Sequence, residues 1–326
     1  MRRIGILTSG GDAPGMNACI RAAVRTALAN GLEIVGIRRG YAGLIEGDTV
    51  PLDRTAIRNT IHLGGTILET SRSLEFTTRD GRARAAEVIR QADLDGLILI
   101  GGEGTFHGAS LLAAEWGTTL VGVPGSIDND VYGTDSCIGF DTAANCALNA
   151  IDRIRDTARS HERLFFVEVM GHYTGFYTGF LALESGIAGG AEELVIPEDP
   201  ISSAELSDRL KEGFKIGKKS AIVVVAEGKN PGKSFQIASE VRKFLNYESR
   251  VVVLGHLQRG GPPTVRDRVL GSVLGVAAVT ALQDGRSGCM VGEVKREIAY
   301  TPFDDTWQKK KPLDADVMRI FSLLSE

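Results

Sequence analysis

The stretch Gly101-Gly102-Glu103-Gly104-Thr105 decides the fold of this chain. The apolar run Gly96–Ile100 precedes it, and a run of helical character, residues 106–116, follows it. Four to eight apolar residues bounded by glycine are typical of a buried strand in a parallel sheet. A helix that starts after such a turn exposes backbone N–H groups at its positive end, where a phosphate binds readily. Glu103 either supplies a carboxylate for Mg²⁺ at this phosphate or is an ordinary surface acid.

The strand–turn–helix pattern recurs along the chain. A strand at 4–8 ends in Ser9-Gly10-Gly11, and a helix at 16–30 and a strand at 33–37 follow, which predicts a parallel βαβ unit. A strand at 119–123 leads into a polar loop with Asp128 and Asp130, which are either a catalytic base with a partner or turn-forming acids. Further strands are predicted at 164–169, 194–196, 221–226, 250–255, 290–294 and 297–300. Further helices are predicted at 142–160, 176–185, 204–215, 235–245, 265–282 and 315–324.

Length and composition narrow the class of protein. A chain of 326 residues predicts two domains. The net charge of −4 gives no reason to expect nucleic acid or an anionic membrane as a partner. The four cysteines contain no C-x-x-C pair, so we expect buried thiols in a reducing compartment. No signal peptide or membrane-spanning run is visible in the sequence, and we expect a soluble cytoplasmic protein.

Three common signatures fail on specific residues. His107 stands where a dinucleotide-binding fingerprint requires its last glycine. The stretch 228–234 imitates a phosphate-binding P-loop but is one residue short, because Glu227 occupies the position of the first glycine. The five histidines show no zinc-ligand spacing. Hydride transfer, P-loop hydrolysis and zinc hydrolysis are therefore disfavoured.

Phosphoryl transfer fits the remaining residues best. It requires positioning, a Mg²⁺ site, cations around the moving phosphoryl group and a base near the acceptor hydroxyl. Open α/β sheets bind ligands beyond the carboxyl ends of their strands, which is where Gly11, Glu103 and Asp128 are predicted to lie. Arginines at turns or strand starts could grip a sugar phosphate in a bidentate manner, although each alone could also be a surface charge. These arginines are Arg163, Arg250 and Arg259, whereas Arg72 offers a cation for the moving phosphoryl group.

Five blocks in order carry a resemblance to a known family. They are Thr8–Asn17 (TSGGDAPGMN), Gly101–Thr105 (GGEGT), Pro124–Asp130 (PGSIDND), Glu168–Gly171 (EVMG) and Gly255–Gly261 (GHLQRGG). Through them the chain resembles the bacterial ATP-dependent 6-phosphofructokinases over nearly its whole length. The resemblance implies a phosphotransferase that uses Mg²⁺ and ATP to phosphorylate fructose 6-phosphate at its 1-hydroxyl in glycolysis.

The resemblance also assigns roles to individual residues. Asp128 would be the base, and Gly11, Arg72 and Ser126 would contact the transferring phosphoryl group. Glu103 and Asp130 would serve the Mg²⁺ ion. The nucleotide site would comprise Gly11, Arg72, Arg82, Gly102, Gly104, Thr105 and Gly108. The sugar phosphate would contact Ser126, Asp128, Asp130, Arg163, Met170, Gly171, His172, Glu227, Arg250, His256 and Arg259.

The implied fold is α/β, with two Rossmann-like three-layer α/β/α domains and mainly parallel sheets. The larger, nucleotide-binding domain would comprise residues 1–138 and 257–305. The smaller, sugar-phosphate-binding domain would comprise residues 139–256 and 306–326. In the family, Arg163 and Arg250 reach the active site of a neighbouring subunit, so the resemblance implies a homotetramer with shared active sites.

An allosteric site for ADP or phosphoenolpyruvate between subunits is also implied. Its matching positions are Arg21, Arg25, Arg54, Arg155, Gly190, Glu192 and Lys218. Ile216 and Ser220 stand where a basic residue and a histidine are usual, which predicts a weaker or altered effector response. The alternative is that these arginines only hold an interface together.

Several positions indicate which phosphoryl donor the protein uses and how active it is. The pyrophosphate-dependent members of the family carry Asp in place of Gly104 and Lys in place of Gly125, so the two glycines favour ATP. Glu103 replaces the usual metal-site Asp, Ser126 the usual Thr, and His172 the usual Arg, while the segment 176–180 is longer by about four residues. Glu103 and His172 leave open the alternative of a low-activity or regulatory paralogue that binds sugar phosphate or nucleotide. A third alternative is a kinase of the wider G-G-D-G-T group acting on NAD or a lipid, although His256 and Arg259 argue against it.

Overall fold

The computed structural model describes residues 1–161, 163–171, 178–228, 231–245 and 247–325. The chain forms two compact units that each combine separate segments. The first unit comprises Met1–Thr142 and Arg259–Lys311, and the second comprises Ala143–Gln258 and Pro312–Glu326. These bounds lie within a few residues of those that the resemblance implies. The assignment of the nucleotide to the first unit and of the sugar phosphate to the second remains a proposal.

The first unit contains a mainly parallel sheet of seven strands in the order β11-β10-β5-β4-β1-β2-β3. Its members are β1 (Arg3–Thr8), β2 (Glu33–Ile37), β3 (Thr49–Pro51), β4 (Gly96–Gly101), β5 (Leu120–Pro124), β10 (Cys289–Val294) and β11 (Glu297–Pro302). The edge strands β3 and β11 pair antiparallel with their neighbours, and the five inner strands run parallel. Every residue of β4 is buried, as the apolar run before Gly101 predicts for a central strand.

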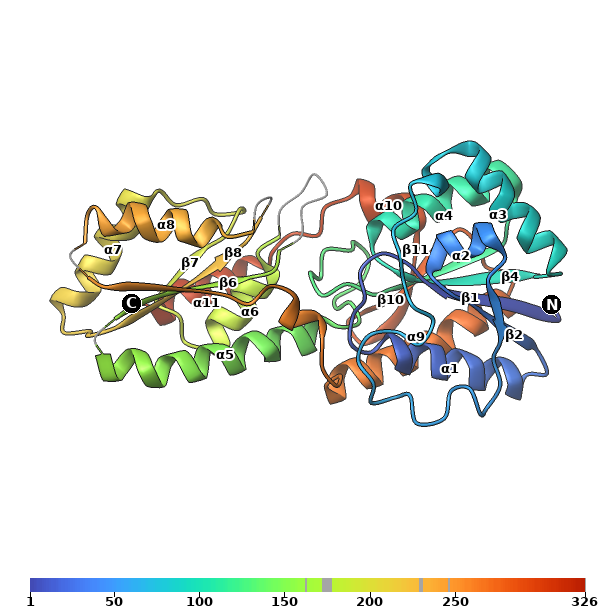
Figure 1. Cartoon of the computed structure of the whole chain (residues 1–326), viewed down its shortest axis with the longest axis horizontal. Coiled ribbons are helices and arrows are strands. Elements are labelled where there is room, and N and C mark those ends of the chain that lie inside the picture. Colours follow the sequence, from blue (N-terminus) through green and yellow to red (C-terminus); the bar gives the residue numbers. More distant parts are fainter. Residues whose placement is uncertain (162, 172–177, 229–230, 246, 326) are drawn as a thin grey trace. The chain divides into compact units, whose positions relative to one another are not determined.

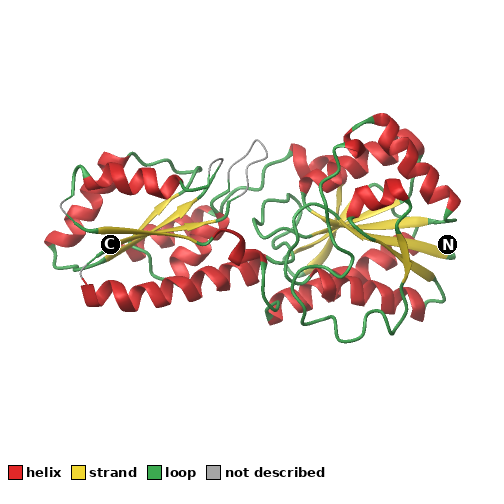
Figure 2. Cartoon of the chain, viewed as in Figure 1, coloured by secondary structure: helices red, strands yellow, loops and turns green. Residues whose placement is uncertain are grey.

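Helices cover both faces of this sheet, which gives the predicted three layers (Figures 1 and 2). One face carries α1 (Met16–Ala29) and α9 (Val265–Gln283), and the other carries α2 (Gly40–Glu46), α3 (Arg79–Gln91), α4 (Glu103–Trp116) and α10 (Phe303–Gln308). Glycine lets α1 and α9 approach closely, because a Cβ on Gly275 would come within 2.5 Å of the Cys19 carbonyl oxygen. The elements α2, α3, β3, α10 and the 3₁₀ turn η1 (Glu75–Thr77) carry no strong sequence pattern and were not predicted.

The second unit contains four parallel strands in the order β7-β8-β6-β9. They are β6 (Leu164–Val169), β7 (Glu193–Val195), β8 (Ala221–Ala226) and β9 (Ser249–Val253). Its helices are α5 (Phe140–His161), which begins in the first unit, α6 (Phe180–Ala188), α7 (Ser203–Lys215), α8 (Lys233–Arg242) and α11 (Ala315–Ser325). A 3₁₀ turn, η2 (Gly255–Arg259), follows β9. The mainly parallel α/β fold is thus confirmed in both units.

Two further expectations can be checked here. Cys19 and Cys137 are buried as predicted, and burial raises the pKa of the Cys137 thiol to about 12, whereas Cys146 and Cys289 are only partly buried. Among the described residues, no helix is long and apolar enough to cross a bilayer.

Candidate active site

Three turns meet at the carboxyl edge of the first sheet, after the neighbouring strands β5, β4 and β1. Hydrogen bonds link them directly. The Thr105 hydroxyl donates to the Ser9 carbonyl oxygen at 3.1 Å, and the Gly125 N–H donates to the Gly101 carbonyl oxygen at 2.9 Å. The carboxyl ends of parallel strands share one edge, which is why turns about 90 residues apart in sequence become neighbours. This edge brings together the predicted residues that follow β1, β4 and β5.

The turn after β4 ends at the N-terminus of α4. Gly102 precedes the helix, and Glu103 is its first residue. A Cβ added at Gly102 or Gly104 would meet no heavy atom of the described chain within 4 Å, so the space beside this helix end is open. Unpaired N–H groups and the helix dipole make such a terminus an anion-binding site. The space predicted to receive a phosphate is therefore open beside this helix end.

The turn after β5 holds Asp128, which is only 4% exposed. The Ser126 hydroxyl donates to Asp130 Oδ1 at 2.8 Å and accepts from the Asp128 N–H at 3.3 Å. Asn129 adopts a left-handed backbone with φ of 55°, and its Oδ1 accepts the Cys137 N–H at 2.9 Å. Asn tolerates this conformation better than most residues, so the loop is fixed locally. These bonds fix the backbone of the loop that carries the buried Asp128 side chain.

Arg259 lies against the turns that follow β1 and β5. Its Nη1 donates to the Asp12 carbonyl oxygen at 3.0 Å, and its Nη2 is 4.0 Å from Asp128 Oδ2. Gly11 allows this approach, because a Cβ there would come within 2.6 Å of Arg259 Nη1. The sequence assigned Arg259 to the sugar phosphate alone. The contact with Asp12 and the proximity to Asp128 are visible only in the structure.

Arg82 has a structural role that the sequence did not indicate. Its guanidinium donates to both carboxylate oxygens of Glu115 at 2.7 Å and to the carbonyl oxygens of Phe76 and Thr77 at 3.1 and 2.8 Å. This bidentate pair ties α3 to α4 and holds the pKa of the Glu115 carboxyl below its ordinary value. Four of the five N–H groups of the Arg82 guanidinium therefore already donate hydrogen bonds within the described chain, which leaves one N–H group for a nucleotide.

The remaining predicted nucleotide residues lie around the same edge. Gly108 is in α4, where a Cβ would come within 2.9 Å of Phe76 in the stacked Phe76–Tyr41 pair. Arg72 is exposed in the segment before η1. That segment is tied to the β1 turn, because the Thr70 hydroxyl donates to the Gly10 carbonyl oxygen at 2.7 Å. Arg72 thus lies two residues from a direct contact with the phosphate-binding turn.

The acidic side chains at this edge of the sheet suit a Mg²⁺ ion that is also bound by substrate phosphates. Among the described residues, no group of three or more His, Cys, Asp or Glu side chains could hold a metal by itself. Glu103 and Asp130 follow adjacent strands of the sheet. Mg²⁺ usually binds one or two carboxylates together with waters and substrate phosphates. The donor set therefore suits an ion that arrives with a nucleotide.

The carboxyl edge of the second sheet carries a separate group of residues. Met170 and Gly171 follow β6, Glu227 follows β8, and His256 follows β9. The Met170 N–H donates to Gln258 Oε1 at 2.8 Å, and Gln258 is completely buried. No role was predicted for Gln258 from the sequence, although its position between His256 and Arg259 is a usable signal. His172 lies outside the described residues.

Arg163 and Arg250 are at the opposite, amino edge of the second sheet. Arg163 precedes β6, and Arg250 is the second residue of β9. A strand rises about 3.3 Å per residue, so a five-residue strand separates the two edges by roughly 16 Å. The structure therefore does not bring these arginines together with Met170, Glu227 and His256 of the same unit.

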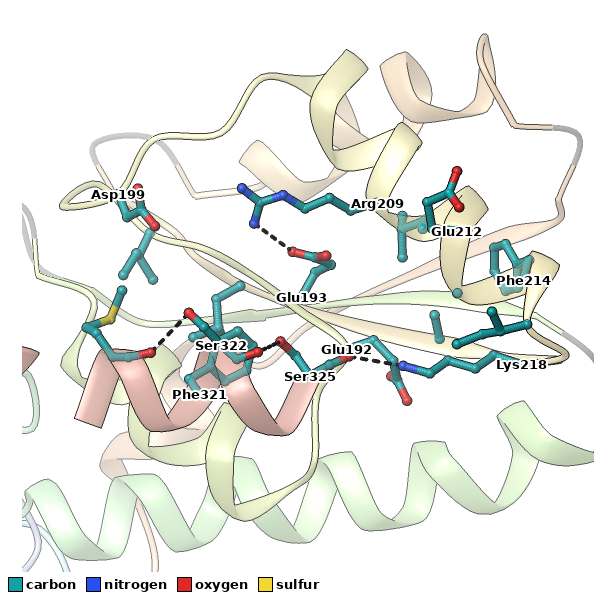
Figure 3. A pocket seen from close by; sticks show the side chains of 17 residues that line it. Glu192, Glu193, Asp199, Arg209, Glu212, Phe214, Lys218, Phe321, Ser322 and Ser325 are labelled. Carbon is teal, nitrogen blue, oxygen red and sulfur yellow. Dashed lines mark hydrogen bonds and ion pairs between the residues drawn. The ribbon is translucent and has the colours of Figure 1, made fainter. Parts of the chain in front are cut away.

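The predicted effector positions divide between the units. Arg21, Arg25 and Arg54 belong to the first unit. In the second unit, Arg155 Nη1 is 3.3 Å from Glu192 Oε1, and its Nη2 donates to the carbonyl oxygens of Gly189 and Gly190. Lys218 donates to the Ser325 carbonyl oxygen at 3.0 Å, at the end of α11. Glu192 and Lys218 line a pocket of about 580 Å³ whose walls also include Phe214 and Phe321 (Figure 3).

Comparison with known proteins agrees with this geometry. The phosphofructokinase family model matches residues 3–282. ATP-dependent 6-phosphofructokinase 1 of Thermus thermophilus is 54% identical over 325 residues, covering 100% of both chains. The ATP-dependent 6-phosphofructokinase of Cytophaga hutchinsonii is 49% identical over 100% of this chain and 98% of its own.

Solved structures show the same fold. Phosphofructokinase from Saccharomyces cerevisiae matches with a TM-score of 0.88 and 32% identity, and the match covers 100% of this chain and 47% of the yeast chain. Pyrophosphate-dependent phosphofructokinase from Marinobacter aquaeolei matches with a TM-score of 0.82 at 23% identity, over 99% of this chain and 91% of its own. The chain belongs to the phosphofructokinase family.

Proposed function

We propose that this chain transfers the terminal phosphoryl group of ATP to the 1-hydroxyl of fructose 6-phosphate, producing fructose 1,6-bisphosphate and ADP in glycolysis. The family match and two bacterial relatives named as ATP-dependent 6-phosphofructokinases support the activity. The observation that carries the mechanism is the buried Asp128, with the Arg259 guanidinium 4.0 Å away, beside the open N-terminus of α4.

Asp128 is the base of this mechanism. It accepts the proton of the sugar hydroxyl while that oxygen forms a bond to the terminal phosphorus of ATP. The bond from this phosphorus to the bridging oxygen breaks, and its electrons leave with ADP. Ser126 and Asn129 fix the Asp128 loop, and Arg259 balances its negative charge. The chain's part in the reaction is therefore positioning and one proton transfer.

Backbone groups are assigned to the nucleotide phosphates. The N–H groups at the start of α4 and the glycine turn after β1 supply donors, and Gly11 and Arg72 are assigned to the transferring group. Glu103 and Asp130 would hold Mg²⁺, which neutralises phosphate charge when it is bound. Glu103 has one more methylene than Asp, so the ion would either lie at a shifted position or contact Glu103 through a water molecule.

Two glycines support ATP as the donor. The open space at Gly104 leaves room for the α-phosphate of a nucleotide. Gly125 packs against Met16, and a Cβ there would come within 2.8 Å of its methyl group, so a lysine would have to displace that side chain. These features agree with the ATP-dependent relatives and disfavour pyrophosphate.

The sugar phosphate is assigned to Met170, Gly171, Glu227, His256 and Arg259. Arg163 and Arg250 are assigned to the same phosphate in a neighbouring copy, because they lie at the amino edge of their sheet, away from the other sugar residues of their own unit. This position supports active sites that are shared between copies, and the resemblance to the family implies that the assembly is a homotetramer. The effector positions, including Glu192 and Lys218, complete the proposal of an allosteric enzyme.

A coupled assay tests the proposal directly. Purified protein is supplied with fructose 6-phosphate and Mg²⁺, and product is measured with ATP and, separately, with pyrophosphate. Turnover with ATP and little with pyrophosphate is expected. Saturable binding of fructose 6-phosphate by calorimetry without product would instead identify a regulatory paralogue, and turnover of NAD or a lipid in a substrate panel would indicate another kinase.

A further inference from the structure

Three charged side chains form a group at the amino edge of the second sheet: Arg163, Glu248 and Arg250. Residues of β6 and β9 pair in parallel register, Leu164 with Ser249 and Phe165 with Arg250, so Arg163 lies beside Glu248. The Leu164 N–H donates to the Glu248 carbonyl oxygen at 3.1 Å, which fixes the backbone there. Glu248 and Arg250 are two residues apart in an extended chain, and therefore share a face.

Glu248 bridges the two arginines with its two carboxylate oxygens. Its Oε2 accepts from Arg163 Nε at 2.9 Å, and its Oε1 forms an ion pair with Arg250 Nη2. These two cations hold the pKa of the Glu248 carboxyl below its ordinary value. One carboxylate therefore fixes the separation of two guanidinium groups that would otherwise repel each other.

The group remains able to bind an anion. Among the described residues, each arginine uses one nitrogen on Glu248, which leaves both Nη groups of Arg163 and the Nε and Nη1 of Arg250 for a ligand. The side chains of Arg163 and Arg250 are 28% and 49% exposed, so these donors are open to solvent. With two positive charges and one negative charge, the group is a net cation that suits a phosphate.

We infer that Glu248 is a positioning residue for the sugar phosphate. It holds Arg163 and Arg250 in a fixed fork, so that the phosphate of fructose 6-phosphate meets two preordered guanidinium groups. The inference rests on the proposed function, which assigns the two arginines to that phosphate. If only the charge of Glu248 mattered, the opposite result would be expected. Removing this negative charge would then strengthen the binding of the sugar phosphate.

The variant E248Q separates these two views. Glutamine keeps the size of the side chain and loses the charge that holds both arginines. Positioning predicts that the KM for fructose 6-phosphate rises about tenfold while kcat changes less than about twofold, since the fork acts in binding rather than in chemistry. An unchanged or lower KM would overturn the inference.

A double-mutant cycle tests whether Glu248 acts through the arginines. If it does, E248Q should raise the KM less in the R163A background than in wild type, because only its contact with Arg250 is then left to lose. Additive effects of the two changes would contradict positioning. A general loss of structure would be recognised by a lower melting temperature and would not produce this non-additivity.

Two controls distinguish the failure of this inference from that of the proposed function. If wild type is active but R163A and R250A keep the wild-type KM, the assignment of the arginines fails, and with it the inference. If R163A and R250A raise the KM and E248Q does not, only the role of Glu248 fails. The matched control E205Q removes a half-exposed carboxylate that pairs with Arg209 at 2.9 Å in the same unit, and its KM should stay at the wild-type value.

Discussion

The carboxyl edges of the two sheets present different kinds of ligand groups. The first edge offers backbone N–H groups, open space at Gly102 and Gly104, and one buried carboxylate, Asp128. The second edge offers mainly side chains, from Glu227 and His256, together with a turn held by Gln258. Backbone donors bind phosphate whatever side chain is nearby, whereas side-chain contacts distinguish one sugar from another. The chemistry and the nucleotide are therefore assigned to the first edge, and the sugar phosphate mainly to the second.

Replacing the base should have the largest effect on the first edge. We expect Asp128→Ser to lower kcat by about 10²–10⁴-fold, the usual cost of removing a general base. Binding of fructose 6-phosphate should largely survive, because the other residues assigned to the sugar phosphate, such as Glu227 and His256, are unchanged. Steady-state kinetics and calorimetry measure the two quantities, and near-wild-type turnover would refute the mechanism.

Gly11→Ala should have the next largest effect. The new Cβ would come within 2.6 Å of Arg259 Nη1 and would push the guanidinium away from Asp128. We expect kcat to fall about 10²-fold, as a misplacement of about 1 Å can cause. Gly285→Ala, in the loop after α9, is the control, because a Cβ there would have no neighbouring atom within 4 Å. The φ of 74° at Gly285 strains any side chain, so the melting temperature of this variant should fall while its kcat is retained.

Gly104→Asp tests the donor site without disturbing the fold. No atom of the described chain lies within 4 Å of the new Cβ, so the melting temperature should stay unchanged. The added carboxylate would repel the nucleotide phosphates, and the KM for ATP should rise about tenfold or more. Gly104→Ala is the matched control, and its KM should change little. Equal effects of Asp and Ala would show that space rather than charge matters at this position.

Gln258→Leu should have the smallest effect, and it acts on the second edge. It leaves the Met170 N–H without its acceptor, which costs about 1–3 kcal/mol if the group stays buried. We expect the KM for fructose 6-phosphate to rise about fivefold while the KM for ATP and kcat remain near wild type. A change in the KM for ATP alone would contradict the division of roles between the two edges.

Much of the fold could be predicted from short apolar runs bounded by glycine. The strands β1, β4 and β5 and the turns that follow them were predicted, because buried parallel strands and βα turns leave a clear local pattern. The helix after Gly102 was predicted to start at residue 106 but starts at Glu103, since glycine and threonine in its first turn hide the start. The short elements α2, β3 and α10 lack such patterns.

The arrangement of the candidate site was less accessible to sequence reasoning. The pairing of Arg82 with Glu115 joins residues 33 positions apart, and local pattern gives no indication of it. The proximity of Arg259 to Gly11 and Asp128 likewise depends on how distant segments return to one edge of the sheet. Residue types could be assigned by resemblance, whereas the partners of each charged side chain required the tertiary structure.

The position of Arg163 and Arg250 at the amino edge has a practical consequence for enzymology. If each copy lends these arginines to another, the specific activity should depend on protein concentration, falling on dilution and recovering when the sample is concentrated. Mixing inactive Asp128→Ser chains with weakly binding Arg163→Ala chains should then restore some turnover, because a hybrid assembly can contain one site that has both an intact base and intact borrowed arginines.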